Sequence, residues 1–390
     1  MVQCSMIAEG MTAQAVSAEI FEKELTMRGL GMTLARLAAS NRAMPSSIGN
    51  DDGRLGELRG FGTNPGDLRA LTYLPKGLPD NAPLVVVLHG CTQNASTYDE
   101  GSGWSQLAEE HGFALLFPEQ RRSNNGNLCF NWYEPRDARR GKGEALSICQ
   151  MVKHVTATHR LDPSRTYVTG LSAGGAMTTV MLATYPELFA GGAVIAGLPF
   201  ASANSLPEAL ERMRGHGSPL RHELAARAQT ASPRSGRGPT LSVWHGTRDF
   251  IVNPANADVI VDQWLDLNGL GSSVGHVETI DGHRREVWRD DEGRDLIEKY
   301  DVQGMGHGTP LDTRGSDACG TAGPHMLEAN ICSTRRIAAF WGLVEEPSAS
   351  RGPGGAHVAL VPEPEAESTP AVIGVHAVIE NALRAAGLMP

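Results

Sequence analysis

The chain has 390 residues, of which 41% are hydrophobic and 20% charged, and its formal net charge is −10. This composition is typical of a soluble globular protein with a sizeable core, and the acidic balance argues against nucleic acid as a partner. Nowhere does the sequence contain the run of about eighteen apolar residues that a membrane span requires. The first residues lack the basic-then-apolar pattern of a signal peptide, which on its own favours a cytoplasmic location.

Residues 1–60 are predicted to form an N-terminal extension that contains an amphipathic helix over Ile20–Ala39. A single large domain is expected over residues 61–345, because apolar runs alternate with helical stretches throughout that range. Strands are predicted at DLRALTYLP, PLVVVLHG, FALLFP, RTYVTG, GGAVIAG, TLSVWHG and LIEKYDV. Of these, PLVVVLHG and FALLFP are predicted to be buried. Helices are predicted at Trp104–His111, Glu144–His159, Ala173–Tyr185 and Asn256–Asn268. This alternation predicts the α/β class, with a mostly parallel sheet covered by helices on both faces.

The alternating pattern is interrupted over residues 198–239, where a helical segment is followed by a Ser/Arg/Gly-rich one. An insertion at this point is expected to lie above the carboxyl ends of the strands, as a lid would. Residues 346–370 are rich in Pro, Glu, Ser and Gly, which predicts a disordered linker. The chain then ends in a predicted amphipathic helix over residues 371–390.

The strongest chemical signal is the pentapeptide Gly170-Leu171-Ser172-Ala173-Gly174. The G-x-S-x-G pattern between a strand and a helix forms the nucleophile elbow of the α/β-hydrolase fold, in which a sharp turn exposes the serine Oγ. Gly271-Ser272-Ser273-Val274-Gly275 also matches the pattern, but it follows the end of a helix and is predicted to be a loop. Ser172 is therefore the predicted nucleophile.

The acid and the base of a triad follow the serine in this fold, in that order along the chain. Asp249 comes directly after the predicted strand TLSVWHG, so its carboxylate is expected at the same rim of the sheet as Ser172. Among the later histidines, His307 is flanked by glycines in GMGHG and is the predicted general base, with His325 as its rival. An aspartate in such a turn is also common as a helix cap, which is the alternative role for Asp249.

An oxyanion hole requires two backbone N–H donors that point at the developing negative charge. Ala173, directly after the nucleophile, is expected to supply one donor. Cys91, in the loop after PLVVVL, is expected to supply the other. His89 in the same loop is interpreted as a structural residue rather than a second base.

These residues carry a resemblance to the esterase family of poly(3-hydroxybutyrate) depolymerases. The resemblance extends from about Leu68 to Trp341 through LVVVLHGCTQNASTYDEGSGWSQLAEEHGFALLFPEQ, CFNWYEP, VTGLSAGGAMTTVMLATYPELFAGGAVIAGLP, WHGTRD, GMGHG and ICSTRRIAAFW. It implies hydrolysis of short-chain esters, often in hydroxyalkanoate polyesters, through an acyl-enzyme and without a cofactor or metal. Many members of the family are secreted, so the resemblance favours an extracellular location.

Related folds also host feruloyl and acetylxylan esterases, so the family does not define the substrate. A serine peptidase or acyltransferase would use the same triad, and a binding protein on this scaffold would usually lack one triad member. The expected partner is thus an ester, polymeric or small. Trp132 and Tyr133 in CFNWYEP are predicted either to line an apolar crevice for the acyl chain or to pack in the core.

Six cysteines lie in the chain, and none has the CxxC spacing of a zinc site. Cys91 and Cys129 lie in loops expected at the active-site rim, and Cys319 and Cys332 flank one short segment. The pairs Cys91–Cys129 and Cys319–Cys332 are the suggested disulfides, with Cys4 and Cys149 free. In a reducing compartment the same residues would be small buried thiols, and the sequence leaves both interpretations open.

Overall fold

The structure is a computed structural model that describes residues 53–233, 238–314 and 318–345. The helix expected over Ile20–Ala39, the linker expected over residues 346–370 and the helix expected over residues 371–390 lie outside the described residues. Among the described residues, no helix is both long enough and apolar enough to cross a bilayer.

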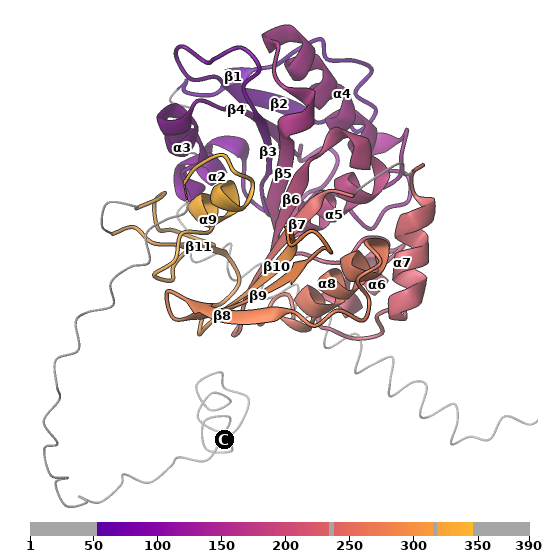
Figure 1. Cartoon of the computed structure of the whole chain (residues 1–390). Helices are drawn as coiled ribbons and strands as arrows, with labels where there is room; N and C mark the ends of the chain where they lie inside the picture. Colours follow the sequence, from indigo (N-terminus) through magenta and orange to yellow (C-terminus); the bar gives the residue numbers. More distant parts are fainter. Residues whose placement is uncertain (1–52, 234–237, 315–317, 346–390) are drawn as a thin grey trace, which may run out of the picture. The chain divides into compact units, whose positions relative to one another are not determined.

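A ten-stranded sheet forms the centre of the described chain, in the order β1-β2-β4-β3-β5-β6-β7-β10-β9-β8 (Figure 1). Its strands are β1 (Gly56–Glu57), β2 (Arg69–Tyr73), β3 (Leu84–Leu88), β4 (Ala114–Glu119), β5 (Thr166–Leu171), β6 (Gly191–Ile195), β7 (Thr240–Gly246), β8 (His276–Ile280), β9 (His283–Arg289) and β10 (Asp295–Val302). A separate parallel pair consists of β11 (Thr309–Leu311) and β12 (Met326–Glu328).

The six strands from β4 to β10 in the middle of the sheet are parallel, and the strands at both edges are antiparallel. Every residue of β3, β4, β5 and β6 is buried. Continuous apolar sequence suits these strands because helices cover both of their faces. The edge strand β8 instead leaves His276, Val277 and Thr279 exposed.

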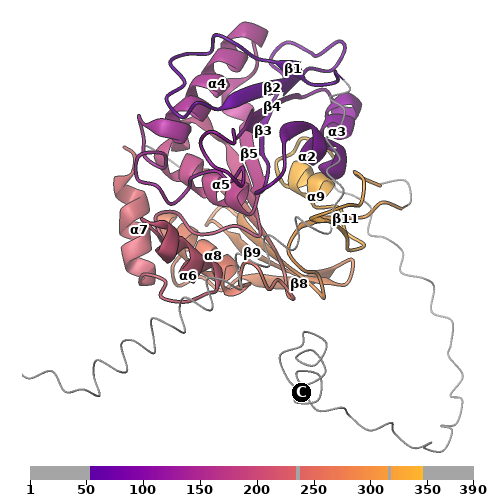
Figure 2. The same cartoon turned by 180° about the vertical axis from the view of Figure 1, so that it is seen from behind.

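Helices cover the sheet in two layers, which the two views show from opposite sides (Figures 1 and 2). One layer contains α2 (Ala95–Ser102), α3 (Trp104–His111) and α9 (Ser333–Phe340). The other contains α4 (Gly143–His159), α5 (Ala173–Thr184), α6 (Leu206–Met213), α7 (Arg221–Thr230) and α8 (Ala255–Leu267). All residues of α5 are buried, because this helix lies under its neighbours as well as on the sheet.

Successive side chains of a strand point to opposite faces, so the sheet separates two hydrophobic cores. Leu84, Val86 and Leu88 of β3 belong to the core beneath α4, α5 and α8. Val85 and Val87 of the same strand belong to the core beneath α2, α3 and α9. The α/β-hydrolase fold predicted from the sequence is confirmed by this arrangement and by the structural similarity reported below.

The insertion over residues 198–239 contains α6 and α7, and it forms ion pairs and hydrogen bonds with α8. Arg221 of α7 makes ion pairs of 2.7 Å with Asp262 and with Asp266 of α8. The side chain of Gln263 bonds the backbone of Phe200 at 3.0 Å and of Leu224 at 2.9 Å. These contacts place the insertion in the helix layer beside α8, and its role as a lid stays a prediction.

At the N-terminal boundary, β1 joins the sheet a few residues before the expected start at residue 61.

Candidate active site

Ser172 occupies the turn between β5 and α5, with φ of 57° and ψ of −116°. A side chain on Gly174 would overlap the backbone carbonyl oxygens of Leu88 and His89, and one on Gly170 would approach Gly174. The two glycines are thus required by close backbone contacts, as the elbow pattern predicts. Ser273 lies instead in the loop between α8 and β8, with no helix after it.

His307 and Asp249 are brought together although they lie 58 positions apart in the chain. Asp249 follows β7, and His307 follows β10, which is the parallel neighbour of β7. Because the carboxyl ends of parallel strands meet at one edge of the sheet, Nδ1 of His307 reaches Oδ2 of Asp249 at 2.7 Å. The carboxylate accepts the Nδ1–H, which leaves Nε2 of His307 as the unprotonated ring nitrogen.

The carboxylate of Asp249 is buried and fully surrounded by donors. Its Oδ1 accepts hydrogen bonds from the backbone N–H of Ile251 at 2.8 Å and of Val252 at 2.9 Å. Burial by itself would raise the pKa of Asp249, but the contacts with His245 and His307 outweigh it and hold that pKa well below its usual value. Asp249 is therefore ionised at neutral pH, as an acid that orients a histidine must be.

His245 is a neighbour of Asp249 that the sequence reasoning missed. This histidine of β7 is buried, and its Nε2 lies 2.9 Å from the carbonyl oxygen of Val252 and 3.2 Å from Oδ2 of Asp249. A ring nitrogen between two acceptors carries the proton, so Nε2–H is the donor. The signal was present in the sequence, because His245 precedes Asp249 by four residues in WHGTRD.

Ser172 and His307 line the same small cavity, of about 20 Å³. The other lining residues are Gly90, Cys91, Thr92, Gln93, Leu171 and His325. The loop after β3 thus forms one wall of this cavity, and His325 forms part of another. Of the predicted triad, Ser172 and His307 line the cavity. Asp249 is buried and reaches the cavity only through its bond to His307.

The backbone donors of the loop after β3 distinguish Cys91 from its neighbours. The N–H of Gly90 donates to Oε1 of Gln93 at 2.8 Å, and the N–H of Thr92 donates to the carbonyl of Asn127 at 2.7 Å. The N–H of Cys91 has no acceptor within the part of the chain that the structure describes. Ala173 is the first residue of α5, and the first N–H groups of a helix have no intrahelical acceptor.

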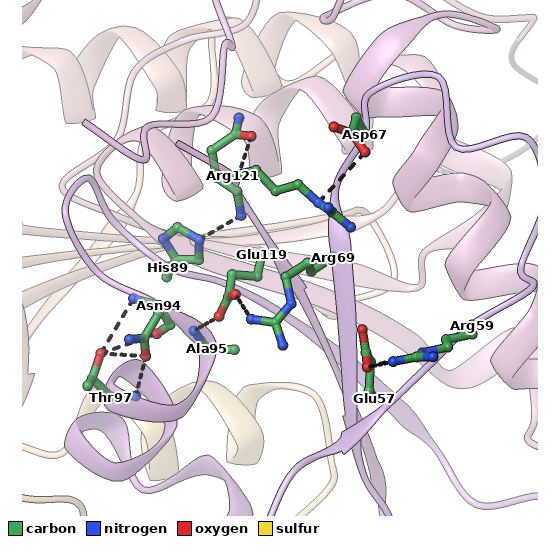
Figure 3. A network of polar contacts seen from close by, with 11 residues as sticks. Glu57, Arg59, Asp67, Arg69, His89, Asn94, Ala95, Thr97, Glu119 and Arg121 are labelled. Atoms are coloured by element: carbon green, nitrogen blue, oxygen red, sulfur yellow. Dashed lines mark hydrogen bonds and ion pairs between the residues drawn. The ribbon is translucent and has the colours of Figure 1, made fainter. Parts of the chain in front are cut away.

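His89 is buried, and both of its ring nitrogens form hydrogen bonds. Figure 3 shows one of the two contacts. Nδ1 lies 2.7 Å from the carbonyl of Gly90 and must donate, so Nε2 accepts the N–H of Gln120 at 3.1 Å. Burial lowers the pKa of His89, which keeps the ring neutral. This arrangement agrees with the interpretation of His89 as a structural residue.

A second polar network anchors the start of α2 to the end of β4 beside His89 (Figure 3). Glu119 accepts the N–H of Ala95 at 2.9 Å and pairs with Arg69 at 2.6 Å. Asn94 caps α2 by accepting the N–H of Thr97 at 2.8 Å. The loop that carries Cys91 is therefore anchored at both of its ends.

Two disulfide bonds reinforce the walls of the cavity. Cys91 is bonded to Cys129, and Cys319 is bonded to Cys332, which confirms both pairings suggested from the sequence. Cys149 is a free buried thiol, and Cys4 lies outside the described residues. The first bond ties the loop with Cys91 to the loop before α4, and the second closes the segment that carries His325.

Trp132 and Tyr133 line a different cavity, of about 440 Å³, which contains no residue of the triad. Trp132 is largely buried, and its ring meets that of Tyr133 edge to face at 5.5 Å. The burial of Trp132 agrees with core packing, and the cavity that both residues line is not the one that contains Ser172. Binding of substrate there stays a prediction.

The sequence model described as "Esterase PHB depolymerase" matches residues 68–288. The chain belongs to this family. Poly(3-hydroxyalkanoate) depolymerase C of Paucimonas lemoignei is 47% identical to this chain over 293 residues, covering 74% of this chain and 70% of that protein. Feruloyl esterase B of Talaromyces funiculosus is 30% identical over 267 residues, covering 66% of this chain and 74% of that protein.

A solved structure of acetyl xylan esterase from Aspergillus awamori has the same fold as this PHB depolymerase esterase. The two superpose with a TM-score of 0.63 at 24% identity, over 74% of this chain and 99% of that one. At this identity the likeness concerns the fold alone. The family membership and the relatives of the preceding paragraph identify the chain as a carboxylic-ester hydrolase of the serine esterase type.

Proposed function

We propose that Ser172, His307 and Asp249 are the catalytic triad of this esterase and that the N–H groups of Cys91 and Ala173 form its oxyanion hole. The observation that carries the proposal is the 2.7 Å hydrogen bond between Asp249 and Nδ1 of His307, made by a histidine that shares a cavity with Ser172. No cofactor or metal takes part in the proposed reaction, because a serine nucleophile and its base are sufficient for ester hydrolysis.

In the first half of the reaction, Oγ of Ser172 attacks the ester carbonyl carbon while Nε2 of His307 takes the hydroxyl proton. The carbonyl oxygen becomes an oxyanion and is stabilised by the N–H groups of Cys91 and Ala173. Collapse of this intermediate breaks the bond to the alcohol oxygen. His307 returns its proton to that oxygen, so an alcohol leaves and Ser172 is acylated.

In the second half, a water molecule attacks the acyl carbon and gives its proton to Nε2 of His307. The second tetrahedral intermediate collapses by breaking its bond to Oγ of Ser172. His307 then protonates Oγ, and a carboxylic acid leaves. Asp249 stays ionised throughout and stabilises the imidazolium that forms in each half.

We propose that the substrate is a hydroxyalkanoate polyester or oligoester, since the relative that is 47% identical is named a poly(3-hydroxyalkanoate) depolymerase. A feruloyl or acetylated polysaccharide ester is the second candidate, supported by the feruloyl esterase that is 30% identical. The two disulfides support an oxidising, extracellular location, because such bonds persist mainly outside the reducing cytoplasm.

The test compares wild type with Ser172→Ala and Ser273→Ala in hydrolysis of p-nitrophenyl butyrate. Ser273→Ala is the matched control, since it makes the same change at the second G-x-S-x-G match. We expect Ser172→Ala to lower kcat by roughly 10⁴- to 10⁶-fold and Ser273→Ala to leave it unchanged. Retention of activity in Ser172→Ala would refute the nucleophile. Relative kcat/KM on hydroxybutyrate oligomers, methyl ferulate and acetylated xylan then decides between the substrates.

A further inference from the structure

The larger cavity, of about 440 Å³, lies between four segments on the α5 side of the sheet. Its lining comes from the loop before α4, the end of α5, the loop after β6, and α7. Figures 1 and 2 both place α4, α5 and α7 on this side of the sheet. A cavity of this volume is in the range that holds small organic ligands.

The chemistry of this cavity differs from that of the protein as a whole. Trp132, Tyr133 and Phe200 give it an aromatic wall, while Arg139, Arg140 and Arg227 bring three positive charges. Among the described residues, no aspartate or glutamate lines this cavity, although the whole chain carries a net charge of −10. An aromatic wall with guanidinium groups suits a ligand that has an apolar body and a negative end.

The three arginines differ in whether they are paired with a carboxylate. Arg140 is engaged by Glu187 at 2.6 Å and by the carbonyl of Thr184 at 2.7 Å. Arg227 donates one N–H to the carbonyl of Ala201 at 2.8 Å, which leaves other N–H groups of its guanidinium. Within the described residues, neither Arg139 nor Arg227 forms an ion pair with a carboxylate, and both side chains are exposed.

Trp132 and Phe200 lie close in the sequence to residues that contact segments beside Ser172. Trp132 follows Cys129, which is bonded to Cys91 of the small cavity. Phe200 follows Gly197, whose backbone lies against Gly175 in the first turn of α5. Three positions along the chain separate each of these aromatic residues of the arginine-rimmed cavity from a residue that contacts a segment beside Ser172.

We infer that the arginine-rimmed cavity binds the free carboxylate end of an organic acid, namely the terminus of an oligoester substrate or of the acid released from it. The aromatic side chains contact the apolar body, and Arg139 and Arg227 bind the carboxylate. The identity of this ligand rests on the proposed function, because a hydroxyalkanoate oligomer carries both an ester and a free carboxylate. Occupation of the cavity selects oligomers with a charged end over neutral esters.

The test measures binding by calorimetry in the Ser172→Ala background, where the probe is not hydrolysed. The probes are the linear trimer of 3-hydroxybutyrate with a free carboxylate and the same trimer as its terminal amide. We expect the acid to bind about tenfold more tightly than the amide, and Arg139→Gln with Arg227→Gln to abolish that difference. Arg122→Gln is the matched control, since Arg122 is also exposed and also donates to a single carbonyl, that of Gly126.

Equal affinity for acid and amide, or a preference that survives the double substitution, overturns the inference, as does the absence of binding at millimolar probe. If the double variant is unfolded, the same comparison of acid with amide is made with Arg139→Gln alone, because Arg139 is exposed and its side chain bonds no residue that the structure describes. Hydrolysis of p-nitrophenyl butyrate by the wild type is measured beside it. Hydrolysis without acid preference refutes only the carboxylate site, whereas acid preference without hydrolysis refutes only the proposed function.

Discussion

The ring of His325 lies edge to face against that of His307, with centroids 5.7 Å apart, and its Nδ1 donates to the backbone carbonyl of His307 at 3.1 Å. Burial lowers the pKa of His325, so its ring stays neutral and Nε2 is an acceptor. In this geometry His325 supports the backbone of His307. Of these two histidines, His307 is the one that bonds a carboxylate among the described residues.

We expect His307→Ala to remove nearly all esterase activity and His325→Ala to retain most of it. A general base needs a ring nitrogen that points at the nucleophile and can accept its proton. Asp249 orients the ring of His307 in this way, and it does not bond His325. The measurement is kcat/KM for p-nitrophenyl butyrate over a range of pH. An inactive His325→Ala beside an active His307→Ala would reverse the assignment of the base.

Asp249→Asn should lower kcat by roughly 10³- to 10⁴-fold without changing the fold. An amide that replaces the carboxylate no longer favours the Nδ1–H tautomer of His307, and it cannot stabilise the imidazolium. Asp80→Asn, at an exposed aspartate, is the control. Because its pKa is held well below the usual value, Asp249 stays ionised in mild acid. Any loss of wild-type activity there should therefore come from protonation of another group. Near-normal kcat in Asp249→Asn would contradict the triad.

The buried carboxyl of Glu144 gives a prediction about stability and pH. Burial and the nearby Asp137 raise the pKa of Glu144 to about 8, although Gln120 and Asn131 donate hydrogen bonds to it. As pH rises from 4.5 toward 8, the unfolded chain releases this proton while the folded chain keeps it. The free energy of unfolding should therefore fall across that window, by roughly 2–5 kcal/mol.

Glu144→Gln has no such proton to release, so its free energy of unfolding should depend less on pH than that of the wild type. Urea denaturation at pH 5, 7 and 9 measures this difference, with Glu100→Gln at an exposed position as the control. Parallel pH profiles for wild type and Glu144→Gln would show that the carboxyl is ionised in the folded protein.

The disulfides should contribute to stability according to the lengths of the loops they close. Residues 319 and 332 are separated by 13 positions, and residues 91 and 129 by 38. In the chain-entropy model these loops correspond to about 3 and about 4 kcal/mol. Cys319→Ala with Cys332→Ala should lower the free energy of unfolding accordingly, as measured in urea without reductant.

Non-reducing peptide mapping checks the pairing itself. Two linked pairs with an unpaired Cys149 are expected, and thiols at all of these positions would refute both bonds. Cys149→Ala is the control for removing a cysteine that forms no disulfide.

The sequence by itself determined the elements whose signals are local. β3 is a continuous apolar run because both faces of this strand are covered, and α5 begins directly after the elbow serine. Ser172 was recognisable because the crowded turn requires glycine at two nearby positions, Gly170 and Gly174. The short strands β1, β11 and β12 escaped prediction, since two or three residues are too few for a periodic pattern.

Only the tertiary structure decided which distant side chains meet. The sequence left His325 as a rival of His307, and the register of β10 beside β7 separated them by carrying His307 to Asp249. Packing likewise put His245 against Asp249 and gave Trp132 a cavity apart from Ser172. The periodicity of a sequence indicates which face of a helix or strand is buried. A contact between residues 58 positions apart depends instead on how whole helices and strands pack. That packing is determined by side chains throughout the core.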